Sequence, residues 1–341
     1  MRWDKIIRMS DKAGSGPDRT EADLNPRQAG AAPVSFGQRL ATRQFAVTAE
    51  IGPPRGAATA PIAEKAALLR GWVDAVNITD NQGATVRLSS LGGSIAALRA
   101  GIEPIMQLTC RDRNRIALQS ELLSASALGV PNVLIMTGDH PRNGDHPDAT
   151  AVFDLDSTRL LSVATAMRDQ GTLMSGAQLN PPPSWMLGAV ENPPGRAASA
   201  AEAAAAAEKA TSRLAGKIDA GAQFVQTQFV FDVGAFAAWM ERVRDQGLHE
   251  RCAILAGVGP VRSERALAHL STIPGVVIPD DVTERLSGLS PDQLRAEGEK
   301  LCSEIIAELA DVPGVAGVHV MAIGAESAIP GIISQAGLPG R

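Results

Sequence analysis

The sequence predicts a closed (β/α)8 barrel, the TIM barrel of the α/β class, and three observations support this prediction. First, the chain contains eight short apolar runs, and strands that are buried on both faces have such continuous apolar sequences. Second, a helix-like segment separates most of the runs, as in a parallel barrel. Third, most runs end in polar residues, and active sites of such barrels lie at the carboxyl ends of the strands. The expected strands are residues 45–51, 73–78, 103–108, 132–136, 172–176, 223–226, 252–256 and 317–323.

Helical periodicity recurs between these runs and supplies the outer layer of the predicted barrel. The segment 198–220 is dominated by alanine, the best helix former, and we interpret it as an outer helix. The expected helices are residues 62–69, 89–99, 113–128, 157–170, 198–220, 233–246, 263–270 and 290–309.

Two long loops are expected at the carboxyl ends of strands, where long loops usually cover a ligand. One covers residues 139–157 after the fourth run. It holds histidines and aspartates, but prolines and a glycine separate them, so we interpret it as a solvated loop and expect no metal. The other covers residues 179–196 after the fifth run, and its prolines prevent it from being helical throughout.

Length and composition favour a soluble protein that acts on small molecules. We assign residues 41–341 to a single barrel domain and residues 1–40, rich in Gly, Pro, Ala and charge, to a loosely ordered N-terminal arm. The net charge of −5 gives no basic face for nucleic acid. No apolar stretch reaches the ~18 residues that span a bilayer, and no signal peptide is recognised. The three scattered cysteines agree with a cytoplasmic protein, and a homo-oligomer is compatible with these features.

Glu50 is the first candidate for catalysis. If its neighbours Ala49 and Ile51 face the helices, the alternation of a strand turns Glu50 into the barrel mouth. A carboxyl group in that place could donate a proton near neutral pH. The alternative interpretation is a strand-end glutamate that pairs with a nearby lysine or arginine.

Thr137, Gly138 and Asp139 follow the fourth run. The glycine lets the backbone approach a ligand closely, and the aspartate can accept hydrogen bonds from ring N–H groups. The alternative for Asp139 is an aspartate that caps a helix or stabilises a turn.

Gln226 and Gln228 end the sixth run, and alternation places both on one face of the strand with Thr227 on the other. An inward glutamine offers a donor and an acceptor, which suits the amide-like edge of a heterocycle. The alternative is an amide bonded to a neighbouring loop. The strand ends are expected to lack inward histidines, which counts against a metal-dependent hydrolase.

Taken together, these segments resemble the methylenetetrahydrofolate reductase family, in the family's order and over nearly the whole chain beyond residue 40. The resemblance implies a (β/α)8 barrel that binds FAD and reduces 5,10-methylenetetrahydrofolate to 5-methyltetrahydrofolate with electrons from NAD(P)H. These small molecules are the expected partners, with no nucleic acid and no membrane. The matching segments are TAEIGPP (48–54), VNITDNQGA (76–84), QLTCRDRNR (107–115), LIMTGDHP (134–141), GKIDAGAQFVQTQFVFD (216–232), AGVGPVRSERA (256–266) and GVHVMAI (317–323).

The resemblance also implies roles for individual residues. Glu50 matches the catalytic glutamate, the proposed general acid that assists opening of the folate imidazolidine ring. Asp139 matches an aspartate between flavin and pterin that tunes the flavin and contacts the folate. Gln228 matches a folate-binding glutamine. The positions that match contacts to the FAD phosphate, ribose or ring are Thr79, Gln107, Thr137, Gly138, Asn180 and Lys217.

Three of these positions depart from the best-known members of the family. Gln107 replaces a histidine, Thr137 an arginine and Asn180 a tyrosine, so the flavin contacts change more than the folate chemistry. An arginine binds a phosphate through two charged N–H groups, and Thr137 in its place cannot do so. Lys217 is therefore the residue expected to hold the pyrophosphate instead. The alternatives are a flavin-independent reductase and a non-catalytic folate-binding or accessory barrel of the same ancestry. The presence of Glu50 and Asp139 favours a working reductase.

Overall fold

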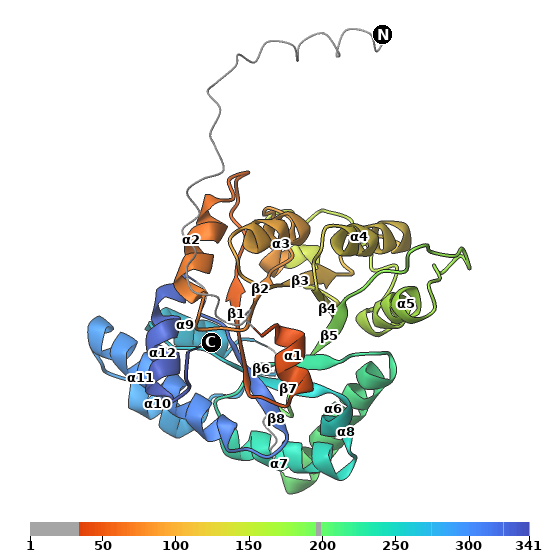
Figure 1. Cartoon of the computed structure of the whole chain (residues 1–341). Helices are drawn as coiled ribbons and strands as arrows, with labels where there is room; N and C mark the ends of the chain where they lie inside the picture. The colour runs from red at the N-terminus through yellow and green to blue at the C-terminus, as the bar shows by residue number, and fades with distance from the viewer. Residues whose placement is uncertain (1–33, 196–198, 274, 323, 341) are drawn as a thin grey trace, which may run out of the picture. The chain divides into compact units, whose positions relative to one another are not determined.

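The computed structural model describes residues 34–195, 199–273, 275–322 and 324–340, and within them eight parallel strands close into a barrel in chain order (Figure 1). The predicted (β/α)8 fold is therefore confirmed. The last strand pairs with the first, which closes the barrel. The strands are β1 (Ala46–Ile51), β2 (Ala75–Ile78), β3 (Pro104–Thr109), β4 (Asn132–Met136), β5 (Met186–Glu191), β6 (Phe224–Phe229), β7 (Ala253–Val258) and β8 (Val315–Val320).

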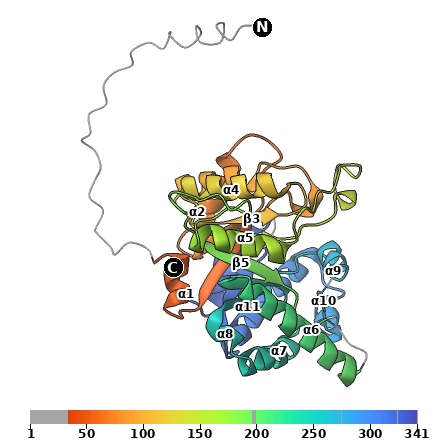
Figure 2. The same cartoon turned by 90° about the vertical axis from the view of Figure 1, so that its right-hand side faces the viewer.

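Helices cover the outside of the barrel, and polar residues cap many of them. Asn114, Asp156 and Ser199 each accept a hydrogen bond from a backbone N–H in the first turn of the helix that follows. In Figure 2, α5 and α6 lie beside β5, which both helices contact. Across the described residues, no helix combines the length and apolar character needed to cross a membrane. The helices are α1 (Phe36–Ala41), α2 (Ala60–Leu69), α3 (Ser90–Arg99), α4 (Arg115–Ala127), α5 (Ser157–Asp169), α6 (Ala200–Asp219), α7 (Val233–Asp245), α8 (Leu248–Arg251), α9 (Glu264–Leu270), α10 (Asp280–Leu286), α11 (Pro291–Ala310) and α12 (Ile329–Gln335), with short 3-10 helices η3 (Gln82–Ala84), η4 (Pro141–Asn143) and η5 (Glu326–Ala328).

Two apolar clusters form the core. The larger lies between the strands and the helices and includes outward-facing strand residues such as Ala49 and Ile51. The smaller fills the barrel interior. Gly188 makes room for it, because a Cβ at this position would lie 2.2 Å from the ring of Phe224. The members of the interior cluster are Phe36, Ala46, Ala75, Ile105, Leu134, Phe224 and Leu255.

Helix α1 closes the end of the barrel at which the strands begin. Phe36 is fully buried and meets the ring of Phe224 edge to face, with 5.3 Å between the centroids. Val34–Arg341 forms one compact unit that includes α1, and the expected boundary between residues 40 and 41 stays a prediction. A helix of six residues is too short to give a periodic signal in the sequence. The rest of the predicted arm, residues 1–33, lies outside the described residues.

The fifth strand also differs from the prediction. Residues 172–176 form no barrel strand, since Thr172 makes an isolated bridge to Gln178 and Gly176 has a φ of 85°. The strand is instead Met186–Glu191, whose glycine and terminal glutamate give it a weak apolar signal. Pairing with β4 and β6 defines it, and this pairing is not visible in the local sequence. The prediction that residues 179–196 form a loop after the fifth strand is therefore wrong, because most of these residues precede or form that strand.

Candidate active site

Glu50 lies at the carboxyl end of β1 and faces the barrel interior, as alternation predicts. It is 6% exposed, while Ala49 and Ile51 pack into the outer core. Gln82 Nε2 donates to one carboxyl oxygen, Oε1, and Gln107 Nε2 donates to the other, Oε2, both at 3.3 Å. The alternative interpretation expected a lysine or arginine beside this carboxyl group. Among the described residues, His319 lies there instead.

Polar side chains below Glu50 form a hydrogen-bonded layer inside the barrel. Asn77 and Gln226 exchange two hydrogen bonds, of 2.6 and 3.1 Å. Gln226 Nε2 also donates to Thr48 Oγ1 at 3.2 Å, and this oxygen lies 3.0 Å from His319 Nδ1. All four residues are buried and come from β2, β6, β1 and β8. Gln226 therefore faces inward as predicted, but its amide binds other side chains of the protein.

His319 is a site residue that the sequence did not single out. The expectation that the strand ends lack inward histidines is wrong, because His319 is 3% exposed and its Nε2 lies 3.9 Å from Glu50 Oε2. A signal for this orientation was present in the sequence. Val318 and Val320 belong to the outer core, and the residue between two outward valines must face inward.

The loop after β4 carries Thr137, Gly138 and Asp139. Gly138 has a φ of 86°, and a Cβ there would lie 2.9 Å from Thr109 Cβ, so both the conformation and the close approach to β3 require glycine. Thr137 Oγ1 donates to Ser157 Oγ at 3.1 Å. Asp139 is exposed, which leaves its carboxyl group accessible at the carboxyl ends of the strands.

Arg111 ties this loop to its neighbours. Its guanidinium donates to the backbone oxygens of Asn81 at 3.3 Å and Asp139 at 3.4 Å, and forms two 2.7 Å bonds to Asp112. The hydrogen bond with Asp112 raises the pKa of Arg111, against the opposing effect of burial. Burial alone would raise the pKa of Asp112, but the hydrogen bond and the charge of Arg111 lower it below its ordinary value. The ionised pair therefore holds the loops after β2, β3 and β4 together.

Thr79 follows β2 directly and offers an unused hydroxyl. It is 1% exposed, and its Oγ1 has no hydrogen-bond partner among the described residues. The next residue, Asp80, is fully engaged, since it accepts hydrogen bonds from Thr109 N and Oγ1 at 2.9 Å and from Arg113 at 2.8 Å. A buried hydroxyl without a partner is unfavourable, so Thr79 is a good candidate for a ligand contact.

Gln228 lies at the end of β6 and is half-buried. Its Oε1 accepts a hydrogen bond from the backbone N–H of Phe229 at 3.2 Å. The pairing register of β6 with β7 shifts between Gln226 and Phe229, which separates the environments of the two glutamines. Gln226 thus belongs to the interior layer, while Gln228 stays near the surface of the barrel mouth.

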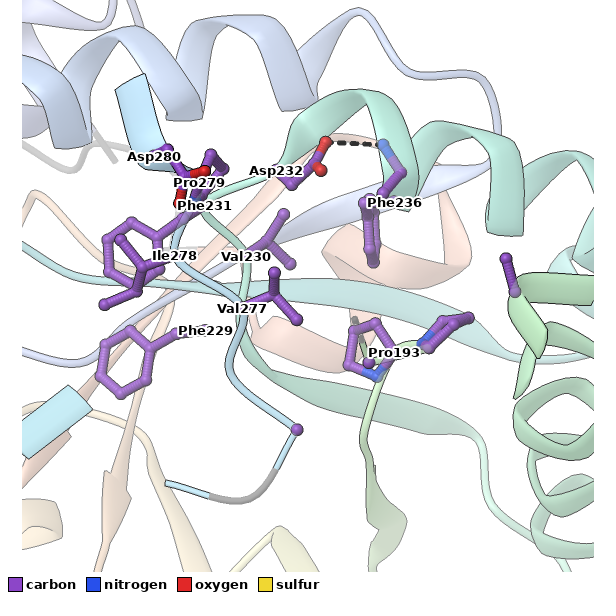
Figure 3. Close-up of a pocket in the computed structure, with 15 residues that line it drawn as sticks. Pro193, Phe229, Val230, Phe231, Asp232, Phe236, Val277, Ile278, Pro279 and Asp280 are labelled. Carbon is purple, nitrogen blue, oxygen red and sulfur yellow. Dashed lines mark hydrogen bonds between the residues drawn. The ribbon is translucent and has the colours of Figure 1, made fainter. Parts of the chain in front are cut away.

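An apolar cavity of about 410 Å³ lies beyond the end of β6 (Figure 3). The rings of Phe229 and Phe231 line it and stack with 6.1 Å between their centroids. Asp232 supplies polar atoms to the wall and caps α7 by accepting a hydrogen bond from Ala235 N at 2.8 Å, which Figure 3 draws as a dashed line. A cavity of this size and lining suits a flat, mostly apolar part of a ligand.

In the loop 139–157, Asp145 and His146 make local contacts. Asp145 accepts a hydrogen bond from Val86 N at 3.2 Å and lies 3.0 Å from His146 Nδ1. Across the part of the chain that the structure describes, no group of three or more His, Cys, Asp or Glu side chains could hold a metal ion.

Two expected cofactor contacts, Asn180 and Lys217, have other surroundings in the structure. Asn180 precedes β5, so it lies near the end at which this strand begins. Its assignment as a flavin contact came from the family resemblance and stays a prediction. Lys217 is in the last turn of α6, where its ammonium donates to Glu191 at 2.6 Å and to Val190 O at 2.5 Å. Arg213 binds the same buried carboxylate at 2.7 Å. The Lys217 ammonium is therefore paired with Glu191, and its contact with a pyrophosphate stays a prediction.

The remaining positions fit part of an FAD molecule. The unpartnered hydroxyl of Thr79, the glycine backbone at Gly138 and the accessible carboxyl group of Asp139 can contact the polar edge of a flavin ring. A pyrophosphate would compete with Glu191 for the ammonium of Lys217. The residues present therefore fit the flavin ring better than its phosphates.

Comparison with known proteins places these features in a family. Residues 35–337 match the methylenetetrahydrofolate reductase family. The chain is 24% identical over 239 residues to methylenetetrahydrofolate reductase 1 of Schizosaccharomyces pombe, a match that covers 70% of this chain and 36% of that protein. A probable methylenetetrahydrofolate reductase (NADPH) of Caenorhabditis elegans is also 24% identical, with 70% and 33% covered. The matched part spans about a third of the length of these relatives.

A bacterial relative and a solved structure give similar matches. The 5,10-methylenetetrahydrofolate reductase of Pectobacterium carotovorum is 25% identical over 194 residues, with 57% of this chain and 56% of that protein covered. A solved protein of Clostridium thermocellum, described as binding two copies of 5-methyl-5,6,7,8-tetrahydrofolic acid, shares the fold. Its TM-score is 0.61 at 16% identity, with 86% of this chain and 96% of that chain covered. The family match extends over most of the barrel and includes every strand, so this chain belongs to the methylenetetrahydrofolate reductase family.

Proposed function

We propose that this protein interconverts 5,10-methylenetetrahydrofolate and 5-methyltetrahydrofolate with electrons from NAD(P)H, as a cytoplasmic enzyme of one-carbon metabolism. The observation that carries the proposal is Glu50, a nearly buried carboxyl group at the carboxyl end of β1, held by the amides of Gln82 and Gln107. Membership of the family supports the same reaction. A buried acid held by neutral amides is suited to donating a proton to a substrate nitrogen.

Glu50 acts as the general acid in this proposal. Protonation of a nitrogen of the folate imidazolidine ring breaks the bond between that nitrogen and the bridging methylene carbon. The carbon is then an iminium centre that accepts a hydride and becomes the methyl group. The proton comes from Glu50 and leaves a carboxylate, and the hydride comes from NAD(P)H, so one proton and one hydride balance the reduction.

Asp139 and Gln228 bind the folate in this proposal. The exposed carboxylate of Asp139 accepts hydrogen bonds from pterin N–H groups, and Arg111 fixes the backbone that carries it. The half-buried amide of Gln228 offers both a donor and an acceptor to the pterin edge. The neighbouring cavity lined by Phe229 and Phe231 then takes an apolar part of a substrate.

FAD would be held at the mouth by Thr79, Gln107, Thr137, Gly138 and Asp139. When bound, it supplies a carrier that takes the hydride from NAD(P)H and gives it to the folate. A second candidate is reduction without flavin, by direct hydride transfer from NAD(P)H. The observation that favours it is the ion pair between Lys217 and Glu191. This pair engages the ammonium group that was expected to bind the pyrophosphate of FAD.

One set of measurements tests the proposal. The purified protein is assayed for oxidation of NADH and of NADPH that depends on 5,10-methylenetetrahydrofolate, before and after titration with FAD. Saturable FAD binding that stimulates the reaction supports the flavin route. Folate-dependent oxidation of NAD(P)H at the same rate before and after the FAD titration, with no FAD bound, supports direct hydride transfer. Absence of folate-dependent oxidation under both conditions contradicts the reductase assignment.

A further inference from the structure

We propose that His319 is a positioning residue for Glu50: its neutral ring presents Nε2–H to the carboxylate that remains after the acid has given up its proton. This inference rests on the proposed function, because it assumes that Glu50 is the acid. It assigns a role to a residue that no sequence motif singled out.

The first step is the placement of the two side chains. His319 Nε2 lies 3.9 Å from Glu50 Oε2, and both residues are nearly completely buried, at 3% and 6% exposure. Gln107 Nε2 donates to the same oxygen at 3.3 Å. A shift of roughly 1 Å would bring the ring nitrogen to hydrogen-bond distance, since such bonds measure about 2.9 Å.

The second step is the direction of the hydrogen bonds beneath the pair. Asn77 Nδ2 donates to Gln226 Oε1, and Gln226 Nε2 donates in return to Asn77 Oδ1. The second hydrogen on Gln226 Nε2 points to Thr48 Oγ1 at 3.2 Å. This oxygen accepts from Gln226, so its own hydrogen has two acceptors within reach, Val318 O at 3.5 Å and His319 Nδ1 at 3.0 Å, and the shorter contact is the one to His319. The neutral ring then carries its proton on Nε2, which faces Glu50.

The third step is the electrostatic consequence. Once Glu50 has protonated the folate nitrogen, a negative charge remains in a buried place, and an unpaired buried charge is costly. Gln82 from η3, Gln107 from β3 and His319 from β8 then supply N–H donors to the two oxygens. The layer below, Thr48 from β1, Asn77 from β2 and Gln226 from β6, contributes a hydroxyl and amides and no charge. A neutral donor lowers the cost of the carboxylate without binding it as strongly as a lysine would, so the carboxyl group can take up a proton again for the next turnover.

The tautomer of His319 gives a test that does not depend on activity. The protein has five histidines, and labelling their ring nitrogens with ¹⁵N allows long-range proton–nitrogen spectra to distinguish the Nε2–H and Nδ1–H forms. The His319→Gln variant identifies the signals of His319 by their loss. At neutral pH we expect a neutral ring with Nε2–H, and in Thr48→Val we expect the Nδ1–H form to gain population. A ring that is Nδ1–H or doubly protonated in the wild-type protein would overturn the inference.

Kinetics with two matched amides test the effect on catalysis. In His319→Gln the amide nitrogen can occupy the place of Nε2, whereas in His319→Asn it reaches only the place of Nδ1. We expect His319→Gln to stay within a few-fold of the wild-type rate and His319→Asn to lose about 10- to 100-fold, the usual effect of one hydrogen bond to a charged group. In His319→Asn the pH at which the rate falls should also be higher than in the wild-type protein, because the ionised carboxylate of Glu50 has lost a hydrogen-bond donor.

The outcomes separate this inference from the function that it assumes. Equal rates and equal pH profiles for His319→Asn and the wild-type protein would refute the role of His319 while leaving the reductase intact. A wild-type protein without folate-dependent NAD(P)H oxidation would refute the proposed function instead. Thermal unfolding of both variants controls for a loss of fold, and because either variant removes the His319 signals, one folded variant is enough to assign them for the tautomer measurement on the wild-type protein.

Discussion

The neutrality of the groups around Glu50 decides its chemistry at the scale of single residues. Its hydrogen-bond donors are the amides of Gln82 and Gln107, and His319 lies just beyond them. A lysine or arginine at hydrogen-bond distance would hold the carboxyl group in its ionised form and would make it a poor acid. The groups that hold Glu50 are neutral amides, which agrees with the general acid proposed for this position.

Replacing Glu50 by glutamine should therefore abolish the acid and preserve the fold. We expect Glu50→Gln to lower folate reduction by about 10²–10⁴-fold, the usual contribution of a general acid. Thermal unfolding should change little because the amide keeps the shape of the side chain. With FAD bound, oxidation of NAD(P)H by an artificial electron acceptor should survive, because that half-reaction needs no proton at folate. Equal loss of both activities would contradict the assignment.

Asp139 should affect folate binding more than stability, since its side chain is exposed. Asp139→Asn keeps the size of the side chain and removes its charge. We expect the KM for 5,10-methylenetetrahydrofolate to rise by about 10-fold or more, in line with one charge-assisted hydrogen bond. Asp148→Asn is a matched control on the exposed loop nearby and should leave KM unchanged. Equal KM values for the two variants would place Asp139 outside the folate site.

At the scale of elements, an ion cluster fastens α6 to the end of β5. Glu191 is buried at the last position of the strand and binds Arg213 and Lys217 of the helix. The side chain of Lys217 is 16% exposed, so solvent screens this pair weakly. The structure thus gives Lys217 a role in stability, while its cofactor role stays a prediction that the same variant tests.

Lys217→Met should accordingly reduce stability and leave flavin binding unchanged. We expect the free energy of unfolding in urea to fall by about 1–3 kcal/mol, because a buried carboxylate loses one partner while Arg213 remains. Lys209→Met changes an exposed lysine on the same helix and should have little effect. The two variants should bind FAD with equal affinity. A loss of FAD affinity confined to Lys217→Met would restore its assignment to the pyrophosphate.

At the scale of the whole molecule, the barrel places its polar site residues at one end and buries its three thiols. Helix α1 covers the end where the strands begin through Phe36, and the polar residues gather where the strands finish. Cys110, Cys252 and Cys302 are free and buried. Burial raises the pKa of each thiol to about 12, with Asp156 adding to the effect at Cys110 and Glu299 at Cys302.

These thiols should be unreactive for as long as the barrel is folded. A raised pKa means that the reactive thiolate is scarce at mildly alkaline pH, roughly one thiol in 10⁴ at pH 8 for a pKa of about 12. We expect no reaction with Ellman's reagent in native buffer and release of three thiols in a single step that coincides with unfolding in urea. A thiol that reacts quickly in the native protein would show a locally open region around it.

The sequence by itself determined the architecture of this protein and the inward direction of Glu50. Continuous apolar runs predicted parallel strands because both faces of such strands are buried, and alternation turned Glu50 inward because successive side chains of a strand point to opposite sides. The position of β5 required the tertiary structure, since pairing with β4 and β6 defines a strand whose own apolar signal is weak. The same holds for the partners of His319 and Lys217. Thr48 and His319 are 271 positions apart in the sequence, and closure of the barrel brings them together. Lys217 and Glu191 are 26 positions apart, and packing of α6 on the barrel brings them together. Local sequence fixes the direction of a side chain, whereas contacts between distant segments decide which side chains it can reach.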